Sequence, residues 1–448
     1  MKKILAFLLA LTLAMSLFTA CGSKISDTPV VTEPSVENPV STTEVPQGET
    51  LPAESDQQTT EPSKNPNPSN GQTWNEYDIS FVEENGIEYI WERLDNEKKD
   101  NLASAMNAIR DVTGFITYKY PMSEEENYDF MQLILNCCVD YPYVRNQFVI
   151  HDNDEDGNID ALTAIFNYEV VETEEQAWNM TARLNQKLDE IVSAMPDGSE
   201  YEKLRYLHDY LVFNCKYSDS IPTFYTAYGA LVDGQATCQG YADAMHLLLS
   251  RAGFETVWCV GVGTEVEGDI QVTHKWNYVK LSDGKWYILD PTWADPANKD
   301  DPTYISYDYF LVSDEELLKD HKEKHENPFF EEPVAESMDH NFHVQEGYYC
   351  TTYDEAVAAV EKQLRTCAEN NTHFIYLRMS DIDAFDEVAD KLLKANRDDG
   401  GHGEIMQLIE NAADETGVNF NHKSWSVYKG YEDGAGPLTF IITLKYNE

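Results

Sequence analysis

Apolar residues recur at helical spacing in several segments between residues 102 and 214. The spacing predicts helices at 102–109, 124–139, 174–194 and 201–214, with a hairpin formed by 147–151 and 159–168 between the second and the third. Another helix candidate starts at Thr226, and β-branched and aromatic residues from Thr256 to Asp290 predict strands. We assign 76–200 to an N-terminal helical and hairpin part and 201–328 to a core.

The pattern changes after an acidic loop rich in proline. Helical spacing predicts helices at 352–368, 384–395 and 404–415, and strand patterns lie at 372–379, 424–429 and 438–446. These elements predict a separate small α/β domain at 345–448. The chain as a whole is therefore expected to belong to the α+β class.

The first 21 residues predict an export signal. Lys2 and Lys3 precede an apolar run, Ile4–Phe18, which is short for a membrane-spanning helix. The run ends in Ala-Cys21-Gly and resembles the bacterial lipoprotein signal, although Phe18 stands where leucine is usual. That resemblance implies that Cys21 is lipidated and anchors the protein on the extracytoplasmic face of the membrane. The alternative is an ordinary cleaved signal peptide.

Composition changes what the chain is expected to contact. Residues 22–75 are rich in Ser, Thr, Pro and Glu, and they predict a disordered tether because they cannot bury enough apolar surface. The 448 residues include 80 acidic and 32 basic side chains, a net charge of −48. Without clustered Lys or Arg, such a charge excludes a nucleic-acid partner.

The cysteine pattern argues against a disulfide scaffold and against zinc. Apart from Cys21 there are seven cysteines, an odd number without regular spacing, and there is no Cys-x-x-Cys motif. We expect no cofactor and no metal. Asp152, Asp154, Asp156 and Asp160 have calcium-loop spacing, but Thr163 stands where an EF-hand has its closing glutamate. The flanking segments also read as strands, so a charged hairpin turn is favoured over a calcium site.

One cysteine stands out by its position. Cys238 begins an amphipathic helix, with Thr237 as the expected N-cap. At a helix N-terminus a thiolate and a developing oxyanion both find stabilising amides and the positive end of the dipole. Gln235 and Gln239 are both candidates for a side-chain oxyanion donor, and the sequence does not choose between them. A buried cysteine that merely starts a core helix is the competing interpretation.

A predicted hairpin supplies partners for that thiol. The loop 282–284 has glycine at its left-handed position, so Leu281 pairs with Lys285. His274 and Asp290 then lie on the same face as diagonal neighbours, roughly 7 Å apart at the backbone. A carboxylate there can hold one nitrogen of the imidazole and leave the other for a thiol.

These segments together resemble a known family. The run Cys238-Gln-Gly-Tyr-Ala, the strand His274-Lys-Trp-Asn and the segment Asp290-Pro-Thr-Trp are similar to the transglutaminase-like superfamily, a papain-like cysteine fold. By that resemblance Cys238 is the nucleophile, His274 the general base and acid, and Asp290 the residue that orients His274. Lys275 stands where relatives often carry alanine, and the pairing puts it on the opposite face.

The predicted function is cysteine-dependent acyl transfer on amides of a protein or peptide substrate, including cell-wall-associated ones. The resemblance leaves open whether water resolves the thioester, as in a peptidase or amidase, or an amine does, as in a cross-linking enzyme. The alternative is a non-catalytic surface- or wall-binding module on the same fold. An intact triad weighs against that alternative, because a binding module has no need of all three residues.

Overall fold

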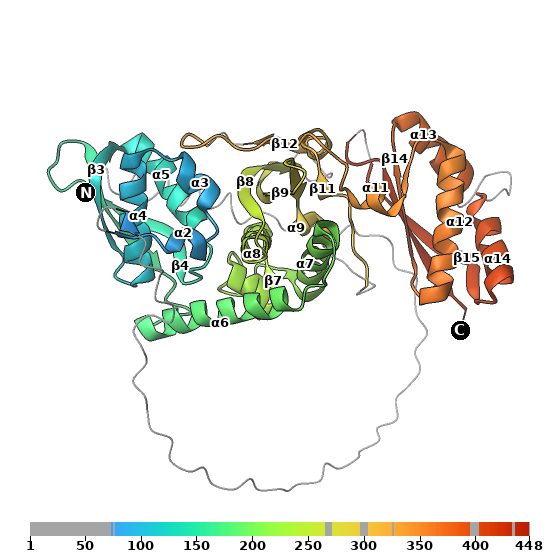
Figure 1. Cartoon of the computed structure of the whole chain (residues 1–448), viewed down its shortest axis with the longest axis horizontal. Coiled ribbons are helices and arrows are strands. Elements are labelled where there is room, and N and C mark those ends of the chain that lie inside the picture. The colour runs from blue at the N-terminus through green and yellow to red at the C-terminus, as the bar shows by residue number, and fades with distance from the viewer. Residues whose placement is uncertain are drawn as a thin grey trace, which may run out of the picture. The chain divides into compact units, whose positions relative to one another are not determined.

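The computed structural model describes residues 73–74, 77–264, 271–295, 303–324, 327–394, 403–431 and 435–447 (Figure 1). The predicted signal peptide with Cys21, and the predicted tether apart from residues 73–74, lie outside the described residues. Among the described helices, none is long and apolar enough to cross a membrane.

The part before residue 170 combines short helices with small sheets. Its elements are β1 (Thr73–Trp74), β2 (Tyr77–Asp78), α2 (Phe81–Glu84), α3 (Glu88–Arg93), α4 (Asn96–Arg110), β3 (Phe115–Ser123), α5 (Glu124–Cys137), β4 (Val144–His151) and β5 (Asn158–Phe166). The predicted helices and the β4–β5 hairpin are confirmed. Strand β3, which pairs with β5, was not predicted, although its residues alternate between exposed and buried positions.

Two long predicted helices follow, α6 (Glu174–Ser193) and α7 (Glu200–Asn214), and each begins with a capping box. The helix expected from Thr226 is short. Its π-helical turn, η1 (Gly229–Asp233), ends where Gly234 takes up left-handed backbone at φ 72°. The chain then enters β7 (Gln235–Ala236), which pairs with β6 (Lys216–Tyr217).

A five-stranded antiparallel sheet follows, with the strand order β11-β10-β9-β8-β12. Its strands are β8 (Glu255–Thr264), β9 (Gln271–Lys280), β10 (Trp286–Leu289), β11 (Phe310–Val312) and β12 (His321–Lys324), and the short helices α9 (Pro291–Ala294) and α10 (Asp314–Leu317) lie between them in sequence. Helix α8 (Cys238–Arg251) packs on β8 and β9 (Figure 1).

The β9–β10 register is the predicted one as far as the ladder extends. Leu281 N–H donates to the Lys285 carbonyl, and Gly284 is left-handed at φ 82°. Pairing continues to Leu289, opposite Asn277, and stops there. The expected place of Asp290 within the hairpin ladder, as a diagonal neighbour of His274, is therefore wrong. Pro291 has no N–H for a ladder, and Asp290 instead caps α9 by accepting from the Thr292 N–H.

The C-terminal part forms a second hydrophobic cluster, made of residues between Cys350 and Leu444. Its elements are α11 (Phe342–Glu346), β13 (Tyr349–Cys350), α12 (Tyr353–Asn370), β14 (Phe374–Met379), α13 (Ile382–Glu387), η2 (Val388–Leu392), α14 (Ile405–Thr416), β15 (Phe420–Lys429) and β16 (Thr439–Tyr446). Its sheet has the order β13-β14-β16-β15. The mixture of helices and sheets confirms the α+β class.

One buried arginine connects this second cluster with the first part of the chain. Arg378 on β14 pairs with Glu316 of α10 at 2.5 Å and donates to the Asp308 carbonyl at 3.2 Å. The arginine is 2% exposed. Removing one partner of such a buried pair is costly, so the loss of either residue should destabilise this contact.

Candidate active site

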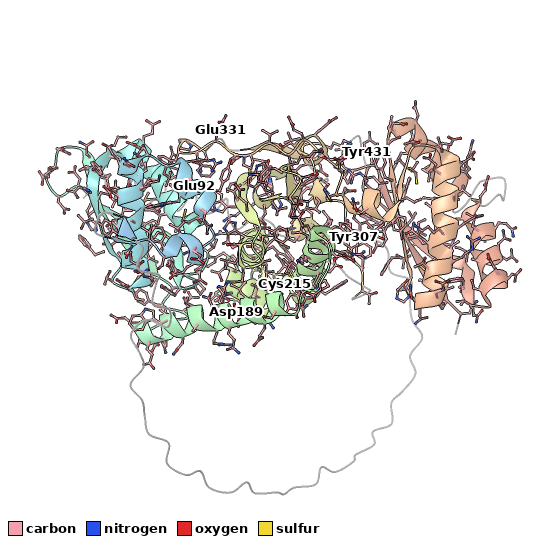
Figure 2. The ribbon with its side chains drawn as sticks, viewed as in Figure 1. Glu92, Asp189, Cys215, Tyr307, Glu331 and Tyr431 are labelled. Carbon is pink, nitrogen blue, oxygen red and sulfur yellow. The ribbon has the colours of Figure 1, made fainter. Side chains whose placement is uncertain are left out.

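The predicted nucleophile begins a helix. Helix α8 starts at Cys238, and Thr237 precedes it in extended backbone, at the expected N-cap position but without a side-chain cap bond. Cys238 is half-buried, whereas the other six described cysteines, such as Cys215 in Figure 2, are buried. The first-turn amides and the positive end of the dipole can stabilise negative charge at this thiol.

Close packing explains why a glycine, Gly240, stands in the first turn of α8. A Cβ on Gly240 would lie 2.7 Å from the Ala236 Cβ and 2.9 Å from the carbonyl oxygens of Phe224 and Thr226. Only glycine lets α8 approach the preceding segment this closely. The position of Cys238 is therefore fixed by backbone packing beneath it.

His274 and Asp290 form the pair that the sequence predicts. His274 Nε2 lies 2.6 Å from Asp290 Oδ2, and the two residues are 2% and 0% exposed. Burial by itself lowers the pKa of His274, but the charge and hydrogen bond of Asp290, together with the Cys238 thiol, raise it to about 9. Asp290 is affected in the opposite sense: burial raises its pKa, and the neighbouring histidines hold it well below its usual range.

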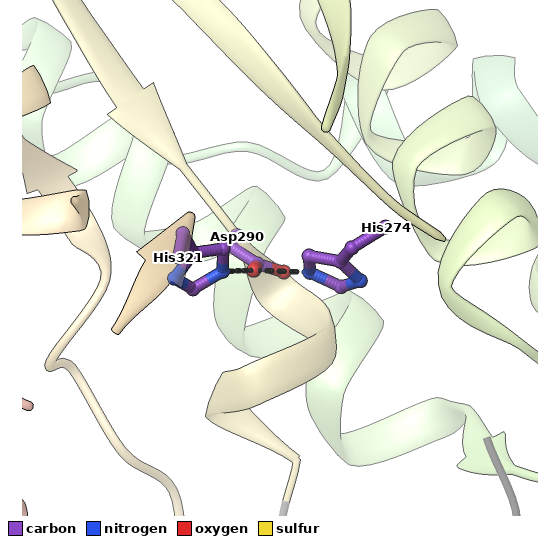
Figure 3. A group of neighbouring side chains, drawn as sticks. All are labelled: His274, Asp290 and His321. Carbon is purple, nitrogen blue, oxygen red and sulfur yellow. Dashed lines mark hydrogen bonds and ion pairs between the residues drawn. The ribbon is translucent and has the colours of Figure 1, made fainter. Parts of the chain in front are cut away.

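The thiol completes the group. The Cys238 thiol is close enough to His274 to help raise the pKa of the imidazole, and its Sγ lies 4.0 Å from the Thr273 carbonyl oxygen. Since Nε2 of His274 faces Asp290, the other ring nitrogen, which points away from Asp290 in Figure 3, remains for the thiol. The structure thus brings together the three predicted residues, and their catalytic roles stay a prediction.

A second histidine, which sequence reasoning missed, completes the surroundings of Asp290. His321 Nε2 lies 3.2 Å from Asp290 Oδ2, on the other side of the carboxylate from His274 (Figure 3). His321 begins β12 within a charged run that reads as surface, and no local pattern ties it to a residue 31 positions earlier. Only the pairing of β12 with β8 brings it there.

The two glutamines left open as oxyanion donors have different partners. The Gln239 side chain hydrogen-bonds Asp243, which also pairs with Lys275 at 2.5 Å. Gln235 accepts at its Oε1 from Ser220 Oγ at 3.0 Å, which fixes the direction of its NH2 group. Neither contact involves the Cys238 thiol, so the choice between the two as oxyanion donor stays open.

Two groups of described residues have the composition of a metal site. In the first, His274, Asp290 and His321, the donor atoms already engage one another, so we assign it to hydrogen bonding.

The second group comprises Asp152, Asp154 and Asp156 in the β4–β5 turn. There Asp152 accepts from the Gly157 N–H at 3.1 Å, and the fourth candidate, Asp160, binds Asn153. The hairpin turn is confirmed. Its expected failure to bind calcium stays a prediction.

Part of the chain is similar to a known family. Residues 189–291 match the transglutaminase-like superfamily. A search of curated proteins finds no match to this chain.

Several solved structures match over part of the chain. A TGase is 18% identical (TM-score 0.23), over 41% of this chain and 52% of its own. A proposed cysteine protease from Cytophaga hutchinsonii is 15% identical (TM-score 0.21), over 30% and 51%. The periplasmic domain of TgpA from Pseudomonas aeruginosa, bound to ethylmercury, is 17% identical (TM-score 0.20), over 33% and 65%. The chain thus spans about half the length of the first two. Residues 189–291, which include Cys238, His274 and Asp290, are therefore identified as a transglutaminase-like domain.

Proposed function

We propose that this protein is an extracytoplasmic, lipid-anchored enzyme that transfers acyl groups from protein or peptide amides through Cys238. The observation that carries the proposal is the contact series from the Cys238 thiol to His274 and from His274 to Asp290, at the start of α8. A nucleophile, a base and a residue that orients the base are the parts that covalent catalysis requires.

The proposed reaction follows from the positions of these groups. His274 takes the proton of the Cys238 thiol, and the thiolate attacks the amide carbonyl carbon. The resulting oxyanion is stabilised by amides at the start of α8. His274 then gives its proton to the leaving amine, and a thioester remains on Cys238.

The second half of the reaction regenerates the enzyme. Water or a primary amine attacks the thioester and passes a proton to His274, and that proton returns to the sulfur as the acyl group leaves. Water gives hydrolysis, and an amine gives a new amide. Asp290 keeps the tautomer and orientation of His274 throughout.

The first test is thiol labelling of the purified protein with iodoacetamide between pH 5 and pH 9, followed by mapping of the modified residues. We expect rapid labelling of Cys238 below pH 7, whereas an ordinary thiol requires a pH near 8.5. Cys238→Ala should abolish this fast phase, and Cys350→Ala, a buried cysteine of the second cluster, should leave it unchanged. Labelling of Cys238 with the pH dependence of an ordinary thiol contradicts the proposal.

A second assay separates the two forms of the reaction. A protein substrate such as casein is incubated with a fluorescent primary amine and the enzyme. Incorporation of the amine indicates cross-linking activity, and new peptide fragments or released ammonia indicate hydrolysis. A Cys238→Ala protein that keeps its full biological effect would instead support the binding-module alternative.

A further inference from the structure

His321 is held by carboxylates at both ring nitrogens. Its Nε2 lies 3.2 Å from Asp290 Oδ2, and its Nδ1 lies 2.9 Å from Asp320 Oδ1. The residue is fully buried at the start of β12. Asp320 in turn accepts a hydrogen bond from the Tyr309 hydroxyl at its other oxygen.

This geometry specifies the protonation state of the ring. A neutral imidazole has one N–H and would turn a lone pair towards one of the two carboxylates. Only the imidazolium donates to both. Burial lowers the pKa of His321, but its hydrogen bonds and the charges of Asp290 and Asp320 raise it to about 9.

The titratable groups around the ring support the same state. They are Asp290 before α9, Asp320 before β12, His274 on β9 and Tyr309 before β11. Two of these four are carboxylates in direct contact with the ring. The remaining close neighbours, Trp276 and Trp293, are uncharged aromatic rings.

We propose that His321 is a positioning residue for the catalytic pair: a buried imidazolium that holds Asp290 from the side opposite His274 and balances part of its charge. This inference rests on the proposed function of Cys238, His274 and Asp290. His321 is fully buried, so it acts by holding Asp290 and by placing a positive charge near His274.

The positive charge of His321 should lower the pH at which His274 loses its proton. The centroids of the two rings are 5.3 Å apart, and a positive charge at that distance disfavours a second one. His274 therefore loses its proton at a lower pH than it would beside Asp290 alone. Removing the charge of His321 should raise the midpoint of this deprotonation by on the order of one pH unit.

The test compares two alkylating reagents on the full-length protein. Iodoacetate is an anion, and a protonated His274 beside the thiolate attracts it, whereas iodoacetamide is neutral. The rate with iodoacetate divided by the rate with iodoacetamide, both measured at Cys238, should therefore fall as His274 loses its proton. In the wild-type protein this fall should occur near pH 9. In His321→Gln, which keeps one N–H donor but has no charge, the fall should occur about one pH unit higher.

His208→Gln is the matched control. His208 on α7 is also fully buried and also lies beside a carboxylate, with its Nδ1 3.2 Å from Asp209 Oδ1. The midpoint of the ratio should stay at its wild-type pH in this variant. If His321→Gln does not fold, Asp320→Asn replaces it: this change weakens the hold of His321 on its proton, and it should move the midpoint upward by a smaller amount.

The outcomes separate the two proposals. An unchanged or lowered midpoint in a folded His321→Gln protein overturns the role of His321 and leaves the proposed function intact. A wild-type ratio that does not vary with pH overturns the proposed function, and this inference with it. A purely structural role for His321 would lower the melting temperature without moving the midpoint.

Discussion

Lys275→Met should make the stability of this protein depend steeply on pH. Lys275 on β9 pairs with Asp243 on α8 at 2.5 Å, and the two side chains are 5% and 7% exposed. The pair therefore joins the helix of the nucleophile to the strand of its base. Methionine keeps the length of the side chain and removes the charge, which leaves Asp243 with the Gln239 side chain as its partner.

The sign of the effect follows from the carboxyl group. Burial already raises the pKa of Asp243, and the charge of Lys275 and its hydrogen bond oppose that rise. Without Lys275 the folded-state pKa rises further above the unfolded value of about 3.9. The folded state then binds the proton more tightly than the unfolded state. The free energy of unfolding must therefore fall as the pH rises between the two pKa values.

The magnitude is set by the proton linkage. Each pH unit within that interval costs about 1.4 kcal/mol, so the variant should lose roughly 2.7 kcal/mol between pH 5 and pH 7. That loss is slightly smaller than the 3–5 kcal/mol that breaking a buried ion pair typically costs in full.

Urea unfolding at pH 5, 6 and 7 measures this loss, with tryptophan fluorescence as the signal. Trp258 is a suitable reporter because Lys275 Nζ lies 5.1 Å from the centroid of its ring. The control is the double variant Asp243→Asn/Lys275→Met, which lacks both charges and should show a stability difference that does not change with pH. If the stability difference between Lys275→Met and the wild-type protein is also independent of pH, the reasoning is refuted.

Three further expectations have simple readouts. Asp290→Asn should reduce turnover by about 10³–10⁴-fold while sparing the fold, because asparagine favours the wrong tautomer of His274; unchanged turnover would remove Asp290 from the triad. Cys21→Ser should move the protein from the membrane fraction to the supernatant, and retention in the membrane would contradict lipidation. Chelation of calcium should leave the melting temperature unchanged, since Thr163 replaces the closing ligand; a rise of several degrees on adding calcium would show that the loop is a site.

Local patterns were sufficient to predict the parts of the site that lie close together in sequence. The start of α8 follows from Thr237 and the amphipathic run behind it, and the β9–β10 register follows from a three-residue loop that ends at Gly284. Together they place Cys238 and His274 correctly. The same reasoning failed at Leu289, where Pro291 stops the ladder and the end of the strand becomes a helix cap.

The remaining parts depend on contacts that no local pattern encodes. His321 reaches Asp290 because β12 pairs with β8, a strand almost sixty residues earlier. Lys275 was expected only to lie on the face opposite His274, and the structure shows it as the buried partner of Asp243. Both arrangements arise from tertiary packing, which periodicity along the chain cannot report.

The buried contacts of Arg378 decide how the chain can be divided. A fragment that ends at residue 328 would keep Cys238, His274 and Asp290. It would leave Glu316, which lies on α10, without its arginine. The Asp308 carbonyl, next to Tyr309, would lose its donor as well. Neither half should therefore be fully native by itself, and two halves produced separately should recover activity by fragment complementation when they are mixed.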